Sequence, residues 1–299
     1  MSNNRTLRIF FIGSVALSEK LLEKLVASGA DIVGVATREQ STFNADFADL
    51  RLLAEKNDIP TIYTIDINAP STLKRIQATN PDIIFCFGWS QLIKAPLLEL
   101  APMGVVGFHP SLLPENRGRH PIIWALALGL ETTGATFFFM DEGADSGPIF
   151  SQERIAISCE DEAASLYSKV EESALRQLVT FLPRLAERTH TQQPQNHALS
   201  NVWRKRGKED GCIDFHATSL SIRNLVRALT RPYIGAHVMF LDQEIKVWRA
   251  EKAPYELSNI EPGKVLSVEC RTITVKTSDG AIRLVEHEFD PLPITGMYL

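Results

Sequence analysis

Short apolar runs alternate with segments of helical periodicity along the first half of the chain. Residues 7–12 (LRIFFI) form a continuous apolar run, as expected for a strand buried on both faces of a sheet. The next segment, 15–28, spaces its leucines at helical intervals and ends at Gly29. The same alternation continues, which predicts strands at 31–37, 61–65, 82–87, 104–109 and 136–140, and helices at 47–56, 71–77 and 162–186. This rhythm predicts an α/β domain with a doubly wound, mostly parallel sheet.

The pattern changes in the last third of the chain. Residues 189–206 are polar and poor in apolar residues, which is typical of a linker. A helix is predicted at 219–228, followed by short strands at 236–240, 244–250, 263–268, 272–276 and 281–288. Short strands at this spacing predict a small open β-barrel. We therefore expect an α/β domain over 1–188, a linker over 189–206 and a barrel-like domain over 207–299.

Composition narrows the class of protein. The chain has 299 residues and a formal net charge of −5, so it lacks the overall basic charge of a nucleic-acid-binding protein. Its apolar runs are much shorter than a membrane span, and its start lacks a signal-peptide pattern. Four scattered cysteines form neither a CxxC pair nor a metal-ligand spacing. We expect a reduced, cytoplasmic protein without a membrane segment or a bound metal.

Three residues at predicted strand ends indicate where a ligand would bind. Gly13, Gly88 and His109 each follow or end an apolar strand. In doubly wound sheets, ligands bind outside the carboxyl ends of the strands. The first loop, FIGSVALSEK, has Gly13 but lacks the rest of a GxGxxG fingerprint. It therefore gives little support for a nicotinamide or flavin cofactor, and Gly13 also fits a simple tight turn.

Two further stretches carry candidate chemistry. In GFHPSLLPENRG (107–118), His109 leads into a stiff turn with two prolines. In MDEGADSG (140–147), Asp145 belongs to an acidic, glycine-bearing loop after another apolar strand. A carboxylate beside the imidazole would fix its tautomer and favour its charged form. The spacing also allows a solvated turn with no such contact, so both interpretations stay open.

These two stretches resemble the signature of the folate-dependent formyltransferases. That family includes methionyl-tRNA formyltransferase and the sugar N-formyltransferases, and its signature has the form HxSLLPxxxG followed by an Asp in a GxDxG loop. The likeness extends to 8–29 and to 205–250, and so spans nearly the whole chain. The resemblance implies a Rossmann-like formyltransferase core, an OB-like second domain, and 10-formyltetrahydrofolate as co-substrate without a metal.

The resemblance also implies roles for individual residues. His109 would take up the proton of an attacking amine, and Asp145 would orient the imidazole. The residues expected to border the folate are Trp89, Ser90, Gln91, Leu92, Met140, Asp141, Glu142 and Gly143. Those expected to meet the second substrate are Gly13, Ser14, Asn44, Pro110, Ser111, Arg117, Gly118 and Arg119.

One position departs from the family pattern. The family has an Asn two positions before the histidine, where it donates a hydrogen bond to the developing oxyanion, and this chain has Gly107. Losing such a donor costs about 3 kcal/mol of transition-state stabilisation. Three interpretations follow: another donor replaces it, the enzyme is slow, or the chain binds its ligands without catalysis. We favour replacement, with Asn116 as the first candidate before Gln91 or a backbone N–H.

The residues around 38–50 indicate the amine acceptor. The tRNA-specific members would need a basic loop there, but REQSTFNADFADL has one arginine and three acidic residues. In RGRH (117–120), Arg117 and Arg119 are suited to a phosphate. We therefore expect a nucleotide-linked amino sugar as acceptor, with methionyl-tRNA as the alternative. The resemblance to sugar members also suggests a homodimer.

Overall fold

The computed structural model describes residues 6–40, 46–255 and 259–299, and these divide into two compact units. Part of the stretch 189–206, predicted as a linker, belongs to the first unit. Segments distant in sequence contribute to each unit. The first unit comprises Met1–Gly118, Thr133–Ile155 and Lys169–Trp203, and the second comprises Arg119–Thr132, Ala156–Ser168 and Arg204–Leu299.

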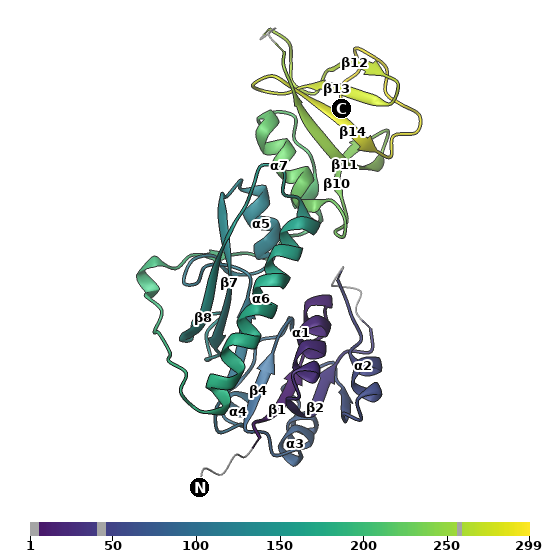
Figure 1. Cartoon of the computed structure of the whole chain (residues 1–299). Coiled ribbons are helices and arrows are strands. Elements are labelled where there is room, and N and C mark those ends of the chain that lie inside the picture. Colours follow the sequence, from purple (N-terminus) through teal and green to yellow (C-terminus); the bar gives the residue numbers. More distant parts are fainter. Residues whose placement is uncertain (1–5, 41–45, 256–258) are drawn as a thin grey trace. The chain divides into compact units, whose positions relative to one another are not determined.

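The first unit is built on a seven-stranded sheet with the order β3-β2-β1-β4-β5-β7-β8 (Figure 1). The pairs among β1 to β5 are parallel, whereas β7 runs antiparallel to β5. The mostly parallel, doubly wound sheet predicted from the sequence is thereby confirmed. The strands are β1 (Arg8–Ile12), β2 (Asp31–Thr37), β3 (Thr61–Tyr63), β4 (Ile83–Cys86), β5 (Val105–His109), β7 (Thr132–Phe139) and β8 (Ile149–Ala156).

Helices cover the sheet because their apolar faces have the required spacing. Figure 1 shows α1 alongside β1 and β2, and the helix buries Leu17, Leu21, Leu22 and Leu25. The long helix predicted at 162–186 is α6. The helices between the strands are α1 (Ala16–Ala27), α2 (Arg51–Lys56), α3 (Pro70–Ala78), α4 (Ala95–Leu98) and α6 (Ala163–Ala186).

Phenylalanines form much of the core of this unit. Phe87, just after β4, packs against Phe137 of β7 with ring centroids 5.3 Å apart. Phe137 in turn packs against Phe181 of α6 at 4.8 Å, in an edge-to-face arrangement. This buried core fixes the central strands, and the candidate site is built on their loops.

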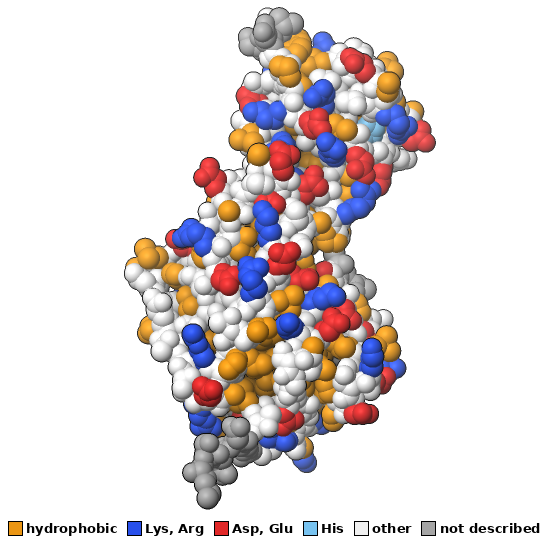
Figure 2. Space-filling model, viewed as in Figure 1, with side chains coloured by type: hydrophobic (Ala, Val, Ile, Leu, Met, Phe, Trp, Pro, Cys, Tyr) orange, Lys and Arg blue, Asp and Glu red, His pale blue; other side chains and the backbone are white. Residues whose placement is uncertain are grey.

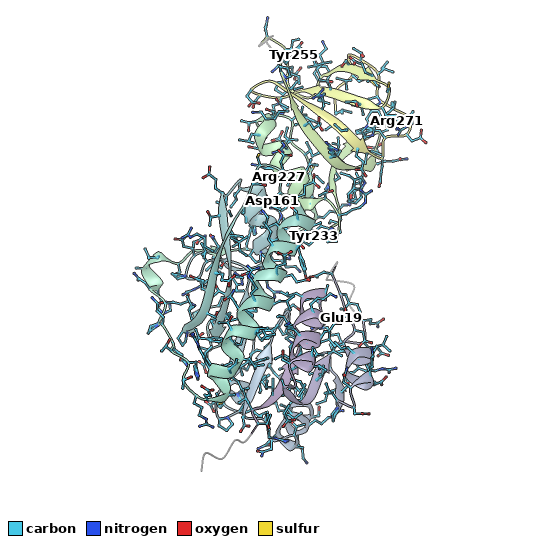
Figure 3. All side chains as sticks on the ribbon, in the orientation of Figure 1. Glu19, Asp161, Arg227, Tyr233, Tyr255 and Arg271 are labelled. Carbon is cyan, nitrogen blue, oxygen red and sulfur yellow. The ribbon has the colours of Figure 1, made fainter. Side chains whose placement is uncertain are left out.

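The second unit contains a five-stranded antiparallel sheet of the kind the sequence predicted. Its order is β10-β11-β14-β13-β12, and α7 (Ser219–Leu229) packs against β11. Figure 3 shows Arg227 of α7 beside Asp161, whose carbonyl accepts a hydrogen bond from the guanidinium at 3.0 Å. The remaining elements are α5 (Pro121–Ala127), β10 (Ala236–Phe240), β11 (Gln243–Ala253), β12 (Val265–Glu269), β13 (Thr272–Lys276) and β14 (Ala281–His287), with the two-residue strands β6 (Arg117–Gly118) and β9 (Val202–Trp203) in the first unit.

The surface and the helices bear on the class of protein. On the face seen in Figure 2, basic and acidic side chains are interspersed. Among the described helices, none has the length and apolar character that crossing a bilayer requires.

Gly13, between β1 and α1, allows two backbone segments to approach closely. A Cβ atom there would lie 2.7 Å from the carbonyl oxygen of Phe87 and 2.5 Å from Cβ of Ser18. The Ser18 hydroxyl also donates to that carbonyl at 2.6 Å. Since the obstructing atoms are backbone or close to it, they cannot move aside easily. Gly13 therefore has a packing role where β1 meets α1.

We predict that Gly13→Ala lowers the free energy of unfolding by about 1–3 kcal/mol through overcrowding. Urea unfolding followed by circular dichroism measures this. Gly207→Ala is the control, because a Cβ there would have no neighbour closer than 4.0 Å. Equal stability of the two variants would contradict the packing role of Gly13.

Candidate active site

His109 is the last residue of β5 and is 5% exposed. The turn that follows is held by neighbouring strands. The Thr136 hydroxyl of β7 donates to the carbonyl of Ser111 at 2.6 Å, and the Gln152 amide of β8 donates to the carbonyl of Leu113 at 2.9 Å. The predicted stiff turn is therefore anchored at two points, which fixes the backbone around the imidazole.

Asp145 reaches His109 by a longer route than the sequence suggests. The strand β7 runs antiparallel to β5. Its last residue, Phe139, therefore pairs near the start of β5, at the opposite end of that strand from His109. The loop after β7 returns, and Oδ2 of Asp145 lies 3.6 Å from Nδ1 of His109. Gly147 makes this return possible, since a Cβ there would lie 1.8 Å from the carbonyl oxygen of Phe139.

The Asp145 carboxylate is also held by the turn after β5. The backbone N–H of Gly118 donates to Oδ2 at 2.9 Å. Asp145 has a left-handed backbone with φ of 54°, a conformation that a non-glycine residue adopts rarely. One carboxylate oxygen thus joins two loops at the imidazole.

Both ring nitrogens of His109 face acceptors. Nε2 lies 2.8 Å from the backbone carbonyl oxygen of Asn116, and since a carbonyl can only accept, Nε2 carries a proton. Nδ1 faces the Asp145 carboxylate. Nε2 is therefore a hydrogen-bond donor, and Nδ1 lies beside a half-buried carboxylate.

Asn116 lies next to His109 through its backbone. Its carbonyl accepts from His109, and its N–H donates to Oδ1 of Asn201 at 2.7 Å. Its φ is 63°, which is again left-handed. The backbone of Asn116 thus contacts His109, and donation from the Asn116 side chain to an oxyanion stays a prediction.

The position of the missing family Asn is packed. A Cβ atom on Gly107 would lie 2.9 Å from both Cγ of Met140 and Cζ of Phe138. Phe138 is the cross-strand partner of Gly107, and its side chain is almost fully buried. The space beside this position is therefore already occupied by apolar side chains.

The residues expected to border the folate come from two strand ends. Trp89, after β4, and Met140, after β7, are partly buried against the same apolar cluster, which includes Cys86 and Val105. The Trp89 indole N–H donates to Oε1 of Gln91 at 3.3 Å, and the Arg38 guanidinium lies 4.8 Å from the indole ring. The Gln91 oxygen thus orients the indole, and only its amide N–H₂ group can serve as a donor.

The loop after Met140 is shaped by its own side chains. Oδ1 of Asp141 accepts from the N–H of Gly143 at 3.0 Å and from the hydroxyl of Ser146 at 2.6 Å. Glu142 and Gly143 are exposed. Asp141 therefore stabilises the loop. Ser90 is half-buried, and Leu92 is 54% exposed.

Several predicted substrate contacts have structural roles. The Arg117 side chain is buried and donates to Gln195 at 2.6 Å, which does not agree with the predicted contact to a substrate phosphate. The buried Ser111 hydroxyl donates to the carbonyl of Glu115 at 2.9 Å, and the buried Ser14 hydroxyl lies 3.5 Å from the carbonyl oxygen of Gly88. Pro110 is half-buried in the anchored turn, Gly118 holds Asp145, Arg119 is exposed, and Asn44 lies outside the described residues.

Sequence reasoning missed the residues behind the site. Gln195, His197 and Asn201 belong to the stretch interpreted as a linker, yet all three contact the turn after β5. Their polar character alone gave no signal of this. Within the described residues, no group of three or more His, Cys, Asp or Glu side chains is placed to bind a metal.

Comparison with known proteins agrees with this geometry. Residues 7–182 match the formyl transferase family, and residues 205–295 match the formyl transferase C-terminal domain. The chain therefore belongs to the formyl transferase family, and the membership predicted from the two motifs is confirmed.

Solved structures share the fold at low sequence identity. WlaRD, described as a sugar 3N-formyl transferase in the presence of dTDP and 5-N-formyl-THF, has 18% identity and a TM-score of 0.71 over 95% of this chain and 98% of its own. An N-formyltransferase from Helicobacter canadensis, in complex with folinic acid and dTDP-3-aminofucose, has 17% identity and a TM-score of 0.69 over 94% and 100%. HypX from Aquifex aeolicus with tetrahydrofolic acid has 19% identity and a TM-score of 0.68 over 94% and 44%, so this chain spans less than half of HypX.

We predict that restoring the family residue by Gly107→Asn lowers the free energy of unfolding by about 1–3 kcal/mol and does not raise turnover. The reason is the crowding from Met140 and Phe138. Chemical denaturation and initial rates measure the two effects. The double variant Gly107→Asn/Met140→Ala should be more stable than additivity predicts, because the second change opens the space. A stable, faster Gly107→Asn variant would contradict this account of the position.

Proposed function

We propose that the protein transfers the formyl group of 10-formyltetrahydrofolate to the primary amine of a nucleotide-linked amino sugar. The observation that carries the proposal is the contact between His109, at the end of β5, and Asp145, on the loop after β7, in a chain of the formyl transferase family. An imidazole beside a carboxylate is suited to moving the proton that an attacking amine must lose.

The acceptor class is supported by the relatives of matching length. WlaRD and the Helicobacter canadensis enzyme are covered over nearly their whole chains, and each is described with dTDP or a dTDP-amino sugar. HypX is more than twice as long as the region that matches this chain, so it gives no comparable support for the acceptor class. The interspersed charges on the face in Figure 2 also suit a small substrate better than the acceptor arm of a tRNA.

In the proposed reaction, the amine nitrogen bonds to the formyl carbon, the bond from that carbon to the folate nitrogen breaks, and one amine proton ends on that nitrogen. His109 would donate from Nε2 to the developing oxyanion, moving this hydrogen bond away from the Asn116 carbonyl. Asp145 would keep the imidazole oriented. The Asn116 side chain stays the first candidate for the donor that the family Asn supplies, and the Nε2–H of His109 is proposed as a second donor to the same oxygen.

The surroundings of Trp89 and Met140 fit a flat heterocycle. Both side chains are partly buried against one apolar cluster, while the loop with Glu142 and Gly143 leaves backbone groups exposed. Such a combination of apolar walls and a few polar groups is typical of ligand sites. We propose that these residues, with Ser90, Gln91, Leu92 and Asp141 around them, hold the folate, which supplies the formyl group.

Two alternative functions each have a specific observation in their favour. Gly107 is the basis for a ligand-binding homologue with weakened catalysis, and the family itself is the basis for methionyl-tRNA as acceptor. A cytoplasmic location follows from the proposed folate chemistry and agrees with four free cysteines. A homodimer remains a prediction from the family resemblance.

We predict that Asp145→Asn lowers kcat/KM by about 10²- to 10⁴-fold, because the amide still accepts from Gly118 but no longer stabilises the imidazolium. The initial rate of formyl transfer, measured by mass spectrometry, gives the result. Melting temperature serves as the control for folding. Unchanged turnover would refute the role of the His109–Asp145 pair.

A panel of acceptors tests the substrate class. We expect turnover with a nucleotide-linked amino sugar, little with the free amino sugar and none with charged initiator tRNA. Turnover with the tRNA alone would favour the tRNA enzyme. Tight folate binding without formyl transfer to any amine would favour the weakened homologue.

A further inference from the structure

The stretch 193–203 contacts the two loops that build the site. Gln193 pairs with Ile149 by two backbone hydrogen bonds of 2.9 and 2.7 Å, just after the Asp145 loop. Further along, β9 pairs in parallel with β6 in the turn after β5. The carboxamide oxygen of Asn201 also accepts a hydrogen bond from the N–H of Asn116 at 2.7 Å. The stretch 193–203 therefore belongs to the same compact unit as His109 and Asp145.

Gln195 is the most deeply placed side chain of this stretch, at 7% exposed. Its Nε2 donates to the carbonyl of Asp145 at 2.9 Å and to the carbonyl of Gly147 at 2.7 Å. Its Oε1 accepts from Nε and Nη2 of Arg117 at 3.2 and 2.6 Å. Both amide hydrogens and both oxygen lone pairs are thus used inside the protein.

These contacts close a ring around Asp145. Gln195 holds the Asp145 carbonyl and the Arg117 side chain, and Arg117 is followed in the chain by Gly118. Gly118 in turn donates to the Asp145 carboxylate. Asp145 is therefore fixed at its backbone by Gln195 and at its side chain by Gly118. Fixing both ends of a residue with a left-handed backbone sets the direction in which its carboxylate points.

We propose that Gln195 is a positioning residue for catalysis, acting with Arg117 to hold the Asp145 carboxylate against His109. This inference rests on the proposed function, and it adds that the predicted linker carries part of the catalytic machinery. A further contact of Arg117 supports it: Nη2, which bonds to Gln195, also donates to Nδ1 of His197 at 3.1 Å, so the same stretch holds the guanidinium through two residues. Because small misplacements of catalytic groups cost about a hundredfold in rate, loss of this ring should reach turnover.

The test is a kinetic cycle of Gln195→Met and Asp145→Asn. Methionine has a similar length but cannot make the four hydrogen bonds. We expect Gln195→Met to lower kcat about ten- to a hundredfold, with each KM within about twofold of wild type. In the Asp145→Asn background, we expect Gln195→Met to lower kcat by less than about threefold, because Gln195 acts on catalysis through Asp145.

A purely structural role gives a different result. A lower folded fraction would reduce kcat by the same factor in both backgrounds, and that outcome overturns the proposal. Gln195→Glu separates donation from packing: its carboxylate can still accept from Arg117 but cannot donate to the two carbonyls, so we expect a loss like that of Gln195→Met. The matched control is Gln192→Met, the same change at an exposed position three residues earlier, which should keep wild-type kcat.

A spectroscopic measurement makes the inference independent of turnover. The ¹⁵N signals of the His109 imidazole, assigned by their absence in His109→Asn, should shift in Gln195→Met and stay in place in Gln192→Met. Unchanged signals in Gln195→Met would overturn the proposal even if no acceptor is found. If Asp145→Asn keeps full turnover while these signals shift, the proposed mechanism fails and the positioning of Asp145 by Gln195 stands.

Discussion

The candidate site depends on the direction of one carboxylate. Asp145 lies on a loop that leaves the sheet at the edge opposite His109 and must return to reach it. A flexible loop of this kind would spread the carboxylate over many positions. Here its backbone carbonyl accepts from Gln195, and its carboxylate accepts from Gly118 in the turn after β5. His109 therefore faces a carboxylate that is held in a fixed direction.

The glycine at position 107 shows how packing and chemistry are linked in this chain. In the family pattern a polar side chain reaches the oxyanion from this position. Here Phe138 and Met140 fill the adjacent space. Met140 also packs on the cluster that supports Trp89, so the apolar wall proposed for the folate extends to the place where the amide would be. The hydrogen bond that His109 can donate from Nε2 then becomes more important, because the family amide is missing from this position.

Much of the fold could be predicted from the sequence, because strands buried on both faces of a parallel sheet appear in the sequence as continuous apolar runs. The strands β1, β4 and β5 have this character, and they were predicted close to their observed bounds. The strand β8 was missed, since the four central residues of IFSQERIA are polar and most of its residues are half-buried or exposed. The short helix α5 was missed for a similar reason, as its seven residues are too few for a clear period.

The residues of the candidate site were also only partly predictable from the sequence. His109 and Asp145 were found from two short motifs, although their spacing alone left a solvated turn equally open. The roles of Arg117, Ser111 and Ser14 depend on which neighbour their polar atoms reach, and the linear sequence does not contain that information. Gln195 illustrates the limit, because a glutamine in a polar stretch has no local feature that separates a surface residue from a buried bridge.

The stretch 193–203 also has a consequence for how the two family domains can be recombined. It lies between the two matched regions, yet its contacts are with the loops of the first. A hybrid of two relatives joined near residue 188 would combine one parent's catalytic loops with the other parent's supporting strand. A junction placed after Trp203 would take the site loops and the stretch 193–203 from the same parent. For such a hybrid, the suitable junction therefore lies later in the chain than its composition suggests.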